Sequence, residues 1–177
     1  MAWMVDGVEI EFVQGDIARQ HGWDAVVNAA NAALRPGGGV AGAIHRAAGP
    51  GLAAECRPLA PIKPGQAVIT SGHNLPNRFV IHCLGPVYGV DQPCDRLLAD
   101  CYRNALVLAD EHALTSIVFP AISTGAFGYP LHEAAVVACR AIRETIPDLK
   151  NLRRIRFVLR DAEAVRIHEA ALAQVLG

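Results

Sequence analysis

The sequence predicts one α/β domain over residues 1–177, built as a three-layer α/β/α sandwich around a mixed, mostly parallel sheet. Three observations support this prediction. The length suits a single domain, and a composition of 52% hydrophobic and 19% charged residues is typical of a packed globule. Short apolar runs also alternate with longer amphipathic patterns along the chain. Such alternation favours a largely parallel sheet with helices on both faces.

Six short runs rich in β-branched residues predict the strands. Runs such as Ala-Val-Val-Asn-Ala-Ala and Phe-Val-Ile-His-Cys-Leu are apolar nearly throughout, rather than alternating with polar residues. This pattern is typical of strands that are covered on both faces. The predicted strands are residues 8–13, 25–29, 67–71, 79–84, 116–120 and 155–159.

Four longer segments predict helices over residues 40–48, 94–112, 131–146 and 162–176. In the second segment Leu97, Leu98 and Cys101 begin a run of apolar positions spaced three and four residues apart. Pro147 is a plausible stop for the third helix, and Asp161 is well placed as the N-cap of the fourth. The proline-bearing segment 58–65 is interpreted as a loop, and no interdomain linker or internal repeat is found.

Charge and hydropathy exclude several classes of protein. The net charge is −1, from 16 basic and 17 acidic residues, whereas proteins that bind duplex nucleic acid usually carry a strong positive footprint. The basic run at 150–160 is interpreted as a charged loop that leads into a strand. No window offers the roughly 18 uninterrupted apolar residues that a membrane span needs. We therefore expect neither nucleic acid nor a membrane as a partner.

The cysteines indicate a reducing environment. Five cysteines are scattered along the chain without a Cys-x-x-Cys pair, which argues against a disulfide framework and against structural zinc. Residues 1–11 carry acidic residues in place of the basic start of a signal peptide. We expect a cytoplasmic protein without a metal or a cofactor. A monomer is expected as well, since no long apolar stripe demands a partner.

A glycine-rich loop at residues 28–49 follows the second predicted strand. Gly37, Gly38 and Gly39 run directly into a helical pattern. Without Cβ atoms the backbone can approach a bulky anion, and a helix start offers free N–H groups. The pattern favours a cradle for a diphosphate, and the alternative is a flexible turn without a ligand.

Two better-known nucleotide fingerprints do not fit this loop. Gly37, Gly39 and Gly42 match Gly-x-Gly-x-x-Gly, but residues 30–36 separate them from the strand, and no acidic residue ends a strand about 20 residues later. No Gly-Lys-Ser/Thr follows, which excludes a P-loop.

A second loop at residues 121–130 follows the strand at 116–120. Its hydroxyl and backbone groups could face phosphate oxygens, and its two aromatic rings could flank a sugar; the residues are Ser123, Thr124, Gly125, Gly128, Phe127 and Tyr129. Alone, the pattern fits a plain turn equally well. Two glycine-bearing loops at strand ends, with no Lys or Arg cluster between them, suit a diphosphate held by backbone dipoles.

The triplet Gly15-Asp16-Ile17 follows the first predicted strand. One interpretation is an aspartate that caps a short helix. The other is a carboxylate that accepts a hydrogen bond from an adenine amino group. The triplet itself does not decide between them.

Taken in order, Gly-Asp-Ile, Asn-Ala-Ala-Asn, Gly-Gly-Gly-Val, Ala-Val-Ile-Thr and Pro-Ala-Ile-Ser-Thr-Gly-x-x-Gly-Tyr-Pro resemble the macrodomain family. The resemblance covers about residues 9–174 and is nearest to bacterial MacroD-type ADP-ribosyl and O-acetyl-ADP-ribose hydrolases. It implies the macrodomain fold, with ADP-ribose or an ADP-ribosylated protein as partner.

The resemblance also implies residue roles. Asp16 would bind the adenine amino group with Ile17 beside the ring, and Arg160 would stack on the adenine. Asn31 would hold the distal ribose while Asn28 braces the loop, and Asn31 and Gly39 would position the ribose and the attacking water. The remaining implied ligand contacts are Gly38, Gly39 and Val40 on one side and Ser123, Thr124, Gly125, Ala126 and Phe127 on the other.

One departure concerns catalysis. MacroD-type hydrolases carry an aspartate after Gly-Gly-Gly-Val, implicated in orienting or activating water, and this chain has Ala41 there. A general base contributes about 10²–10⁴-fold. Other macrodomains, including viral ones, also have alanine at this position and still hydrolyse ADP-ribosyl esters, with water positioned by the substrate phosphate and the loops. His45 and His82 are interpreted as packed or core residues rather than catalytic ones.

Three hypotheses follow from the resemblance. The first is an ADP-ribose-binding hydrolase that acts on esters of acidic side chains or on O-acetyl-ADP-ribose. The second, motivated by Ala41, is a module that binds ADP-ribose without turnover. The third is a phosphatase that acts on ADP-ribose 1″-phosphate in the same pocket.

Overall fold

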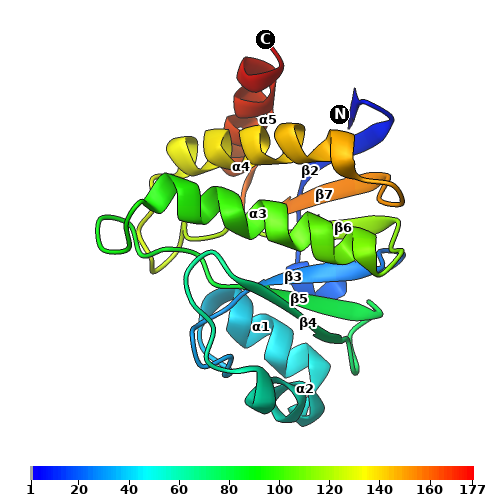
Figure 1. The fold of residues 1–177 in the computed structure, drawn as a ribbon, viewed down its shortest axis with the longest axis vertical. Helices are drawn as coiled ribbons and strands as arrows, with labels where there is room; N and C mark the ends of the chain where they lie inside the picture. The colour runs from blue at the N-terminus through cyan, green and yellow to red at the C-terminus, as the bar shows by residue number, and fades with distance from the viewer. Residues whose placement is uncertain (1) are drawn as a thin grey trace.

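The computed structural model describes residues 2–177, which form one seven-stranded sheet flanked by helices (Figure 1). The strand order across the sheet is β1-β2-β7-β6-β3-β5-β4. The strands are β1 (Ala2–Val5), β2 (Val8–Gln14), β3 (Ala25–Ala29), β4 (Ala67–Ser71), β5 (Phe79–Cys83), β6 (Ser116–Phe119) and β7 (Arg154–Leu159).

Five central strands are parallel, and both edge strands run the other way. The pairs β2–β7, β7–β6, β6–β3 and β3–β5 are parallel, while β1 pairs with β2 and β4 with β5 in antiparallel fashion. The prediction of a mixed, mostly parallel sheet is confirmed. Strand β1 was not predicted. It joins β2 through Asp6 and Gly7, which have φ values of 47° and 81°, the left-handed conformations that a tight Asp-Gly hairpin turn requires.

Five helices lie on the faces of the sheet, and four of them have bounds close to the predicted ones. They are α1 (Gly39–Ala48), α2 (Pro50–Cys56), α3 (Cys94–Glu111), α4 (Leu131–Thr145) and α5 (Ala162–Leu176). Short 3₁₀ turns cover η1 (Ile17–Arg19), η2 (Arg57–Leu59) and η3 (Ile146–Asp148). Helix α2 was missed. It begins at Pro50, immediately after Gly49 ends α1 with a φ of 83°.

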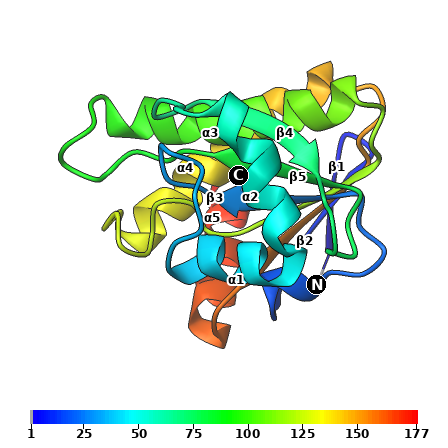
Figure 2. The same ribbon diagram turned by 90° about the horizontal axis from the view of Figure 1, so that it is seen from below.

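The sheet separates two apolar cores. Helices α3, α4 and α5 pack on one face around residues such as Leu98, Phe119 and Phe157. Helices α1 and α2 pack on the other face, around Ile44 and Leu52. Figure 2 looks onto α1 and α2 from below, with α3 beyond the sheet. These layers confirm the three-layer sandwich.

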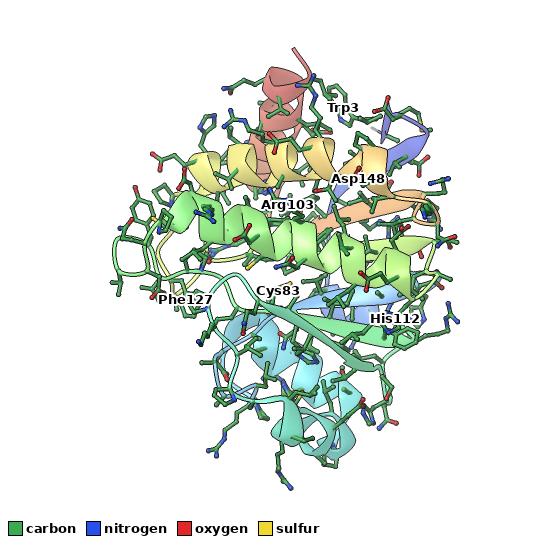
Figure 3. The ribbon with its side chains drawn as sticks, in the orientation of Figure 1. Trp3, Cys83, Arg103, His112, Phe127 and Asp148 are labelled. Carbon is green, nitrogen blue, oxygen red and sulfur yellow. The ribbon has the colours of Figure 1, made fainter. Side chains whose placement is uncertain are left out.

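The two ends of the parallel strands carry different segments of the chain. Residues that precede β6 lie at the end where the parallel strands begin, and residues that follow β6 lie at the carboxyl end. Figure 3 shows His112 and Phe127 at these opposite ends of the molecule. In open α/β sheets ligands bind beyond the carboxyl ends of the strands. A ligand site is therefore expected at the end that carries Phe127. None of the helices between residues 2 and 177 has the length and apolar character needed to span a bilayer.

Candidate functional site

Both glycine-bearing loops leave the sheet from neighbouring strands. Strand β3 pairs with β6 in parallel, with Ala25 opposite Ile117 and Val26 opposite Val118. The loop after β3 and the loop after β6 therefore both start at the carboxyl end of the parallel strands. The sequence predicted these two loops as partners, and the topology places their starting points on adjacent strands.

The loop after β3 ends in the first turn of α1. Gly38 is the N-cap, and Gly39 begins the helix with a φ of 55°. The first intrahelical bond of the turn runs from the Gly42 N–H to the Gly38 carbonyl over 3.2 Å. The N–H groups of Gly39, Val40 and Ala41 precede this bond and have no acceptor within the helix. A Cβ added at Gly38 or Gly39 would meet no atom within 4 Å, so the backbone here borders open space.

Gly42 allows the loop to fold back onto α1. A Cβ at this position would lie 2.3 Å from the carbonyl oxygen of Gly37, closer than any real contact. Only glycine permits that approach, so the third glycine of the formal Gly-x-Gly-x-x-Gly match has a structural explanation that needs no dinucleotide.

Asn31 braces the same loop through its amide group. Its Nδ2 donates to the Arg35 carbonyl over 2.8 Å, and its Oδ1 accepts from the Arg35 N–H over 3.0 Å. An amide offers two N–H donors and two carbonyl lone pairs. One donor and one lone pair of Asn31 therefore stay available, and its side chain is held in one orientation.

Asn28 lies in β3, just before the loop begins. It is buried in β3, and its Nδ2 lies 3.1 Å from Nδ1 of His82, its neighbour across the β3–β5 pair. It therefore ties two strands together beneath the loop. Asn28 was expected to brace its loop. Its bond instead braces the sheet at the strand from which the loop starts.

The two hydroxyl groups of the loop after β6 donate their hydrogen bonds to carbonyl groups of the protein. Ser123 has a φ of 68° and donates its hydroxyl to the Pro86 carbonyl over 2.8 Å. Thr124 donates its hydroxyl to the Ala121 carbonyl, also over 2.8 Å. These two side chains shape the loop, and only their backbone groups and hydroxyl lone pairs can face a ligand.

Backbone N–H groups of this second loop remain free. Within residues 2–177, no acceptor is found for the N–H groups of Gly125, Ala126 and Phe127. A Cβ at Gly125 would meet nothing within 4 Å. The two loops thus present two sets of unpaired N–H donors, at residues 39–41 and 125–127, neither of which includes a lysine or arginine. Backbone dipoles bind anions through donors of this kind.

The segment after β5 supports the second loop and was missed from sequence. A Cβ at Gly85 would lie 2.1 Å from the hydroxyl oxygen of Ser123, so only glycine lets the loop come this close. Tyr88 donates its N–H to the Phe127 carbonyl over 2.9 Å. A glycine directly after a buried strand, next to Pro86, was the available signal.

Asp16 follows β2 at the same edge of the sheet and caps the η1 turn. Its Oδ1 accepts from the Ala18 N–H over 2.9 Å, while its Oδ2 lies 3.6 Å from Nε of Arg19. The capping interpretation is correct, yet the side chain is 55% exposed. The second carboxylate oxygen is therefore available to a ligand. Ile17 is buried beside it in the core under α1 and α2.

Arg160 follows β7, the strand that lies beside β2 in the sheet. Its side chain is 88% exposed, with Nε 3.7 Å from a carboxylate oxygen of Asp161. An ion pair so exposed and so long constrains a side chain little. The guanidinium of Arg160 is therefore held only weakly by the protein.

Both histidines near α1 are interior residues, as predicted. His82 is fully buried, with Nε2 3.0 Å from the Thr70 hydroxyl and 3.7 Å from the Cys56 thiol. Burial lowers the pKa of His82 to about 4, with His45 adding to the effect. Desolvation also lowers the pKa of His45, whose ring lies 6.5 Å from that of His82. Both rings are therefore neutral at physiological pH.

Other side chains offer little further chemistry. Between residues 2 and 177, no three His, Cys, Asp or Glu side chains come together as a metal site would require. Burial raises the pKa of Cys56 to about 11 and that of Cys101 to about 12, so these thiols are poor nucleophiles.

The arrangement now matches a known family. The family model of the Macro domain matches residues 27–138, which include both loops. The chain belongs to the macrodomain family. A macro domain-containing protein of Chlorobaculum tepidum is 46% identical over 171 residues, 96% of this chain and 99% of that protein. An O-acetyl-ADP-ribose deacetylase of Klebsiella pneumoniae is 46% identical over 171 residues, 94% of this chain and 97% of that one.

Solved macrodomains share the fold of this one. A mutant macrodomain of Oceanobacillus iheyensis with ADPR has a TM-score of 0.94 and 38% identity, and the match covers 99% of this chain and 98% of that chain. The Trypanosoma brucei macrodomain in complex with ADP-ribose has a TM-score of 0.85 and 36% identity, over 92% of this macrodomain and 68% of the other.

Proposed function

We propose that this macrodomain binds ADP-ribose at the carboxyl edge of its sheet, with the diphosphate between the two glycine-bearing loops. One observation carries the proposal: the loops that follow the neighbouring parallel strands β3 and β6 each carry backbone N–H groups without a protein acceptor, at Gly39–Ala41 and at Gly125–Phe127. A helix start adds a positive dipole end that favours an anion. The Oceanobacillus iheyensis macrodomain with ADPR and the Trypanosoma brucei macrodomain in complex with ADP-ribose support the choice of ligand.

The adenine end belongs beside Asp16. The carboxylate oxygen that does not cap η1 would accept the adenine amino proton, and Ile17 would contact the ring. Arg160, which follows the neighbouring strand β7, would place its planar guanidinium over the base, since arginine stacks on aromatic faces.

The distal ribose belongs beside Asn31. Its amide keeps one donor and one lone pair free while two bonds to Arg35 fix its orientation. Val40 and Phe127, both partly buried against the core under α1 and α2, would enclose the sugar. Two adjacent hydroxyl groups of the ribose would match the one free donor and the one free acceptor of this amide.

We propose further that the protein hydrolyses ADP-ribosyl esters of acidic side chains or O-acetyl-ADP-ribose. Water adds across the ester bond, so that free ADP-ribose and a carboxylic acid leave. No base stands at Ala41, and His45 is buried. The substrate's own phosphate, Asn31 and the Gly39 backbone would position the water, because positioning alone can lower a barrier by several kcal/mol. The name of the Klebsiella pneumoniae relative supports this chemistry.

A time course of ADP-ribose release tests the hydrolase. The substrate is a glutamate-linked mono-ADP-ribosylated protein, at substoichiometric enzyme. Multiple turnovers that Asn31→Ala abolishes are expected. Tight ADP-ribose binding by calorimetry without any turnover would instead establish the second candidate, a binding module, which Ala41 favours. Inorganic phosphate released from ADP-ribose 1″-phosphate would identify the third candidate, a phosphatase.

A monomer in the cytoplasm is the context that we propose for this activity. The large exposed apolar side chains are scattered rather than gathered in one stripe, at Met4, Leu59, Tyr88, Val90 and Val107. The cysteines are free. Size-exclusion chromatography with light scattering tests the monomer.

A further inference from the structure

A hollow lies beside the loop that follows β3, lined by none of the residues proposed to bind ADP-ribose. Its volume is about 490 Å³, and its walls come from residues 33–36, from α2 and from the segment that follows α2. Arg35 and Arg57 line it from two sides, and Ala33, Ala53 and Pro61 provide small apolar walls. We call this hollow the arginine cavity.

The two guanidinium groups of the arginine cavity are unneutralised. Both arginines are exposed, and within residues 2–177 neither side chain forms an ion pair with a carboxylate. The surrounding chain adds to the positive charge, since residues 25–66 contain three arginines, one lysine and a single acidic residue, Glu55. The Glu55 carboxylate is already bonded to Ser71 and His73.

The cavity walls are held in place by the fold. Leu34 has a φ of 54° and is almost fully buried in the core under α1 and α2. The Ile62 N–H donates to the Ala32 carbonyl over 3.0 Å, which joins the two loops that form the walls. A non-glycine residue in the left-handed region is costly and persists only where its surroundings determine it. The cavity is therefore preformed.

The arginine cavity lies next to Asn31, because the Asn31 side chain is bonded to the backbone of Arg35, which lines the cavity. Asn31, the proposed ribose contact, holds both backbone groups of Arg35 through its amide. Four residues of chain span at most about 14 Å even when fully extended. A polypeptide that leaves the distal ribose beside Asn31 therefore begins within reach of the cavity.

We propose that the arginine cavity receives the acidic side chains that flank the modified residue of an ADP-ribosylated protein. This proposal rests on the proposed function and names the polypeptide part of its substrate. The planar guanidinium pairs with a carboxylate through two parallel hydrogen bonds. Alanine and proline walls fit the short aliphatic stem of an aspartate or glutamate. Acidic flanks and a site with unneutralised arginines are complementary in charge.

Two peptides provide the test. Each carries one ADP-ribose through a non-hydrolysable linkage, with Asp and Glu flanks in one and Asn and Gln flanks in the other. Wild-type protein is expected to bind the acidic peptide about fivefold more tightly at low salt, the effect of two partly exposed ion pairs. Arg35→Ala/Arg57→Ala should lose this preference and still bind free ADP-ribose as wild type does, because Asn31 holds only the backbone of Arg35.

A matched control removes two exposed arginines from the other face of the sheet. Arg140→Ala/Arg166→Ala, on α4 and α5, changes the net charge equally and should keep the preference. Normal ADP-ribose binding with no preference in wild type, or a preference that survives in the Arg35/Arg57 variant, overturns the cavity proposal alone. Failure of wild-type protein to bind free ADP-ribose overturns the proposed function, and the cavity proposal with it.

Discussion

Gly125→Glu gives a direct test of the backbone cradle. Gly125 has a backbone conformation that any residue can adopt, and a Cβ there meets nothing within 4 Å. The variant should therefore fold with little loss of stability. Its carboxylate would stand beside the unpaired N–H groups of Gly125–Phe127, where the proposal places the diphosphate.

The expected effect follows from charge. A carboxylate about 5 Å from one phosphate charge, at an effective dielectric constant near 20, is repelled by roughly 3 kcal/mol. That corresponds to a loss of about 100-fold in affinity for ADP-ribose. Calorimetric titration measures the affinity, and thermal unfolding checks that the variant is folded.

Gly125→Gln separates charge from size. The glutamine side chain has nearly the same volume without the charge, so it should weaken binding much less, and the difference between the two variants should shrink as salt is raised. If folded Gly125→Glu protein bound ADP-ribose within threefold of wild type, the diphosphate would not lie against this loop.

Four further predictions concern single positions. Asp16→Ala should weaken ADP-ribose binding by about 1–3 kcal/mol, and calorimetry should show that the variant no longer prefers ADP-ribose over its hypoxanthine analogue, which lacks the amino group. Gly42→Ala should destabilise the fold by about 1–3 kcal/mol in urea unfolding, because its Cβ would meet the Gly37 carbonyl at 2.3 Å; an unchanged midpoint would contradict this. Ala41→Asp should raise kcat for ADP-ribose release by roughly 100-fold by adding a base, and an equal or lower kcat would show that water is positioned without one. Finally, burial lowers the pKa of His82 to about 4 in the folded protein. As the pH falls, the His82 side chain therefore becomes protonated in the unfolded chain at a higher pH than in the folded one. The free energy of unfolding should be greatest above pH 6.5 and fall by about 3 kcal/mol as the pH drops to 4, a slope that His82→Gln should reduce in urea titrations.

Regular elements of the fold were predicted well where the sequence pattern is local. The bounds of β3, β4 and α5 match the prediction, because β-branched apolar runs and the Asp161 cap specify them within a few residues. Strand β1 was not predicted from the sequence, because its four residues alternate between partly and largely exposed positions. Helix α2 escaped because its seven residues follow α1 after a single glycine, too short for a helical period to be visible.

The candidate site divides in the same way. The location of the two loops was predictable, since glycine runs after buried strands are local signals. Which atoms of these loops are free for a ligand was not predictable, because hydrogen-bond partners such as Ser123 and Pro86 are distant in sequence. The Ser123 hydroxyl is occupied by the Pro86 carbonyl, 37 residues away, and the approach of the two segments depends on Gly85.

Asn28 and Asn31 have the same side chain, but the fold gives them different structural roles. Asn28 and Asn31 lie three residues apart, but the end of β3 falls between them. Asn28 is drawn into the sheet, where it meets His82 on β5, and the Thr70 hydroxyl on β4 holds the other side of that ring. Asn31 lies outside the sheet and fixes the loop through Arg35. Buried bonds across three strands thus make a rigid base for a loop whose own ligand groups are backbone N–H donors. Donors of that kind are oriented by the chain rather than by side-chain rotamers, so the precision of the cradle depends on the polar network beneath it. A loss of ADP-ribose affinity in a folded variant of Asn28, whose side chain is almost fully buried in β3, would be the signature of this dependence.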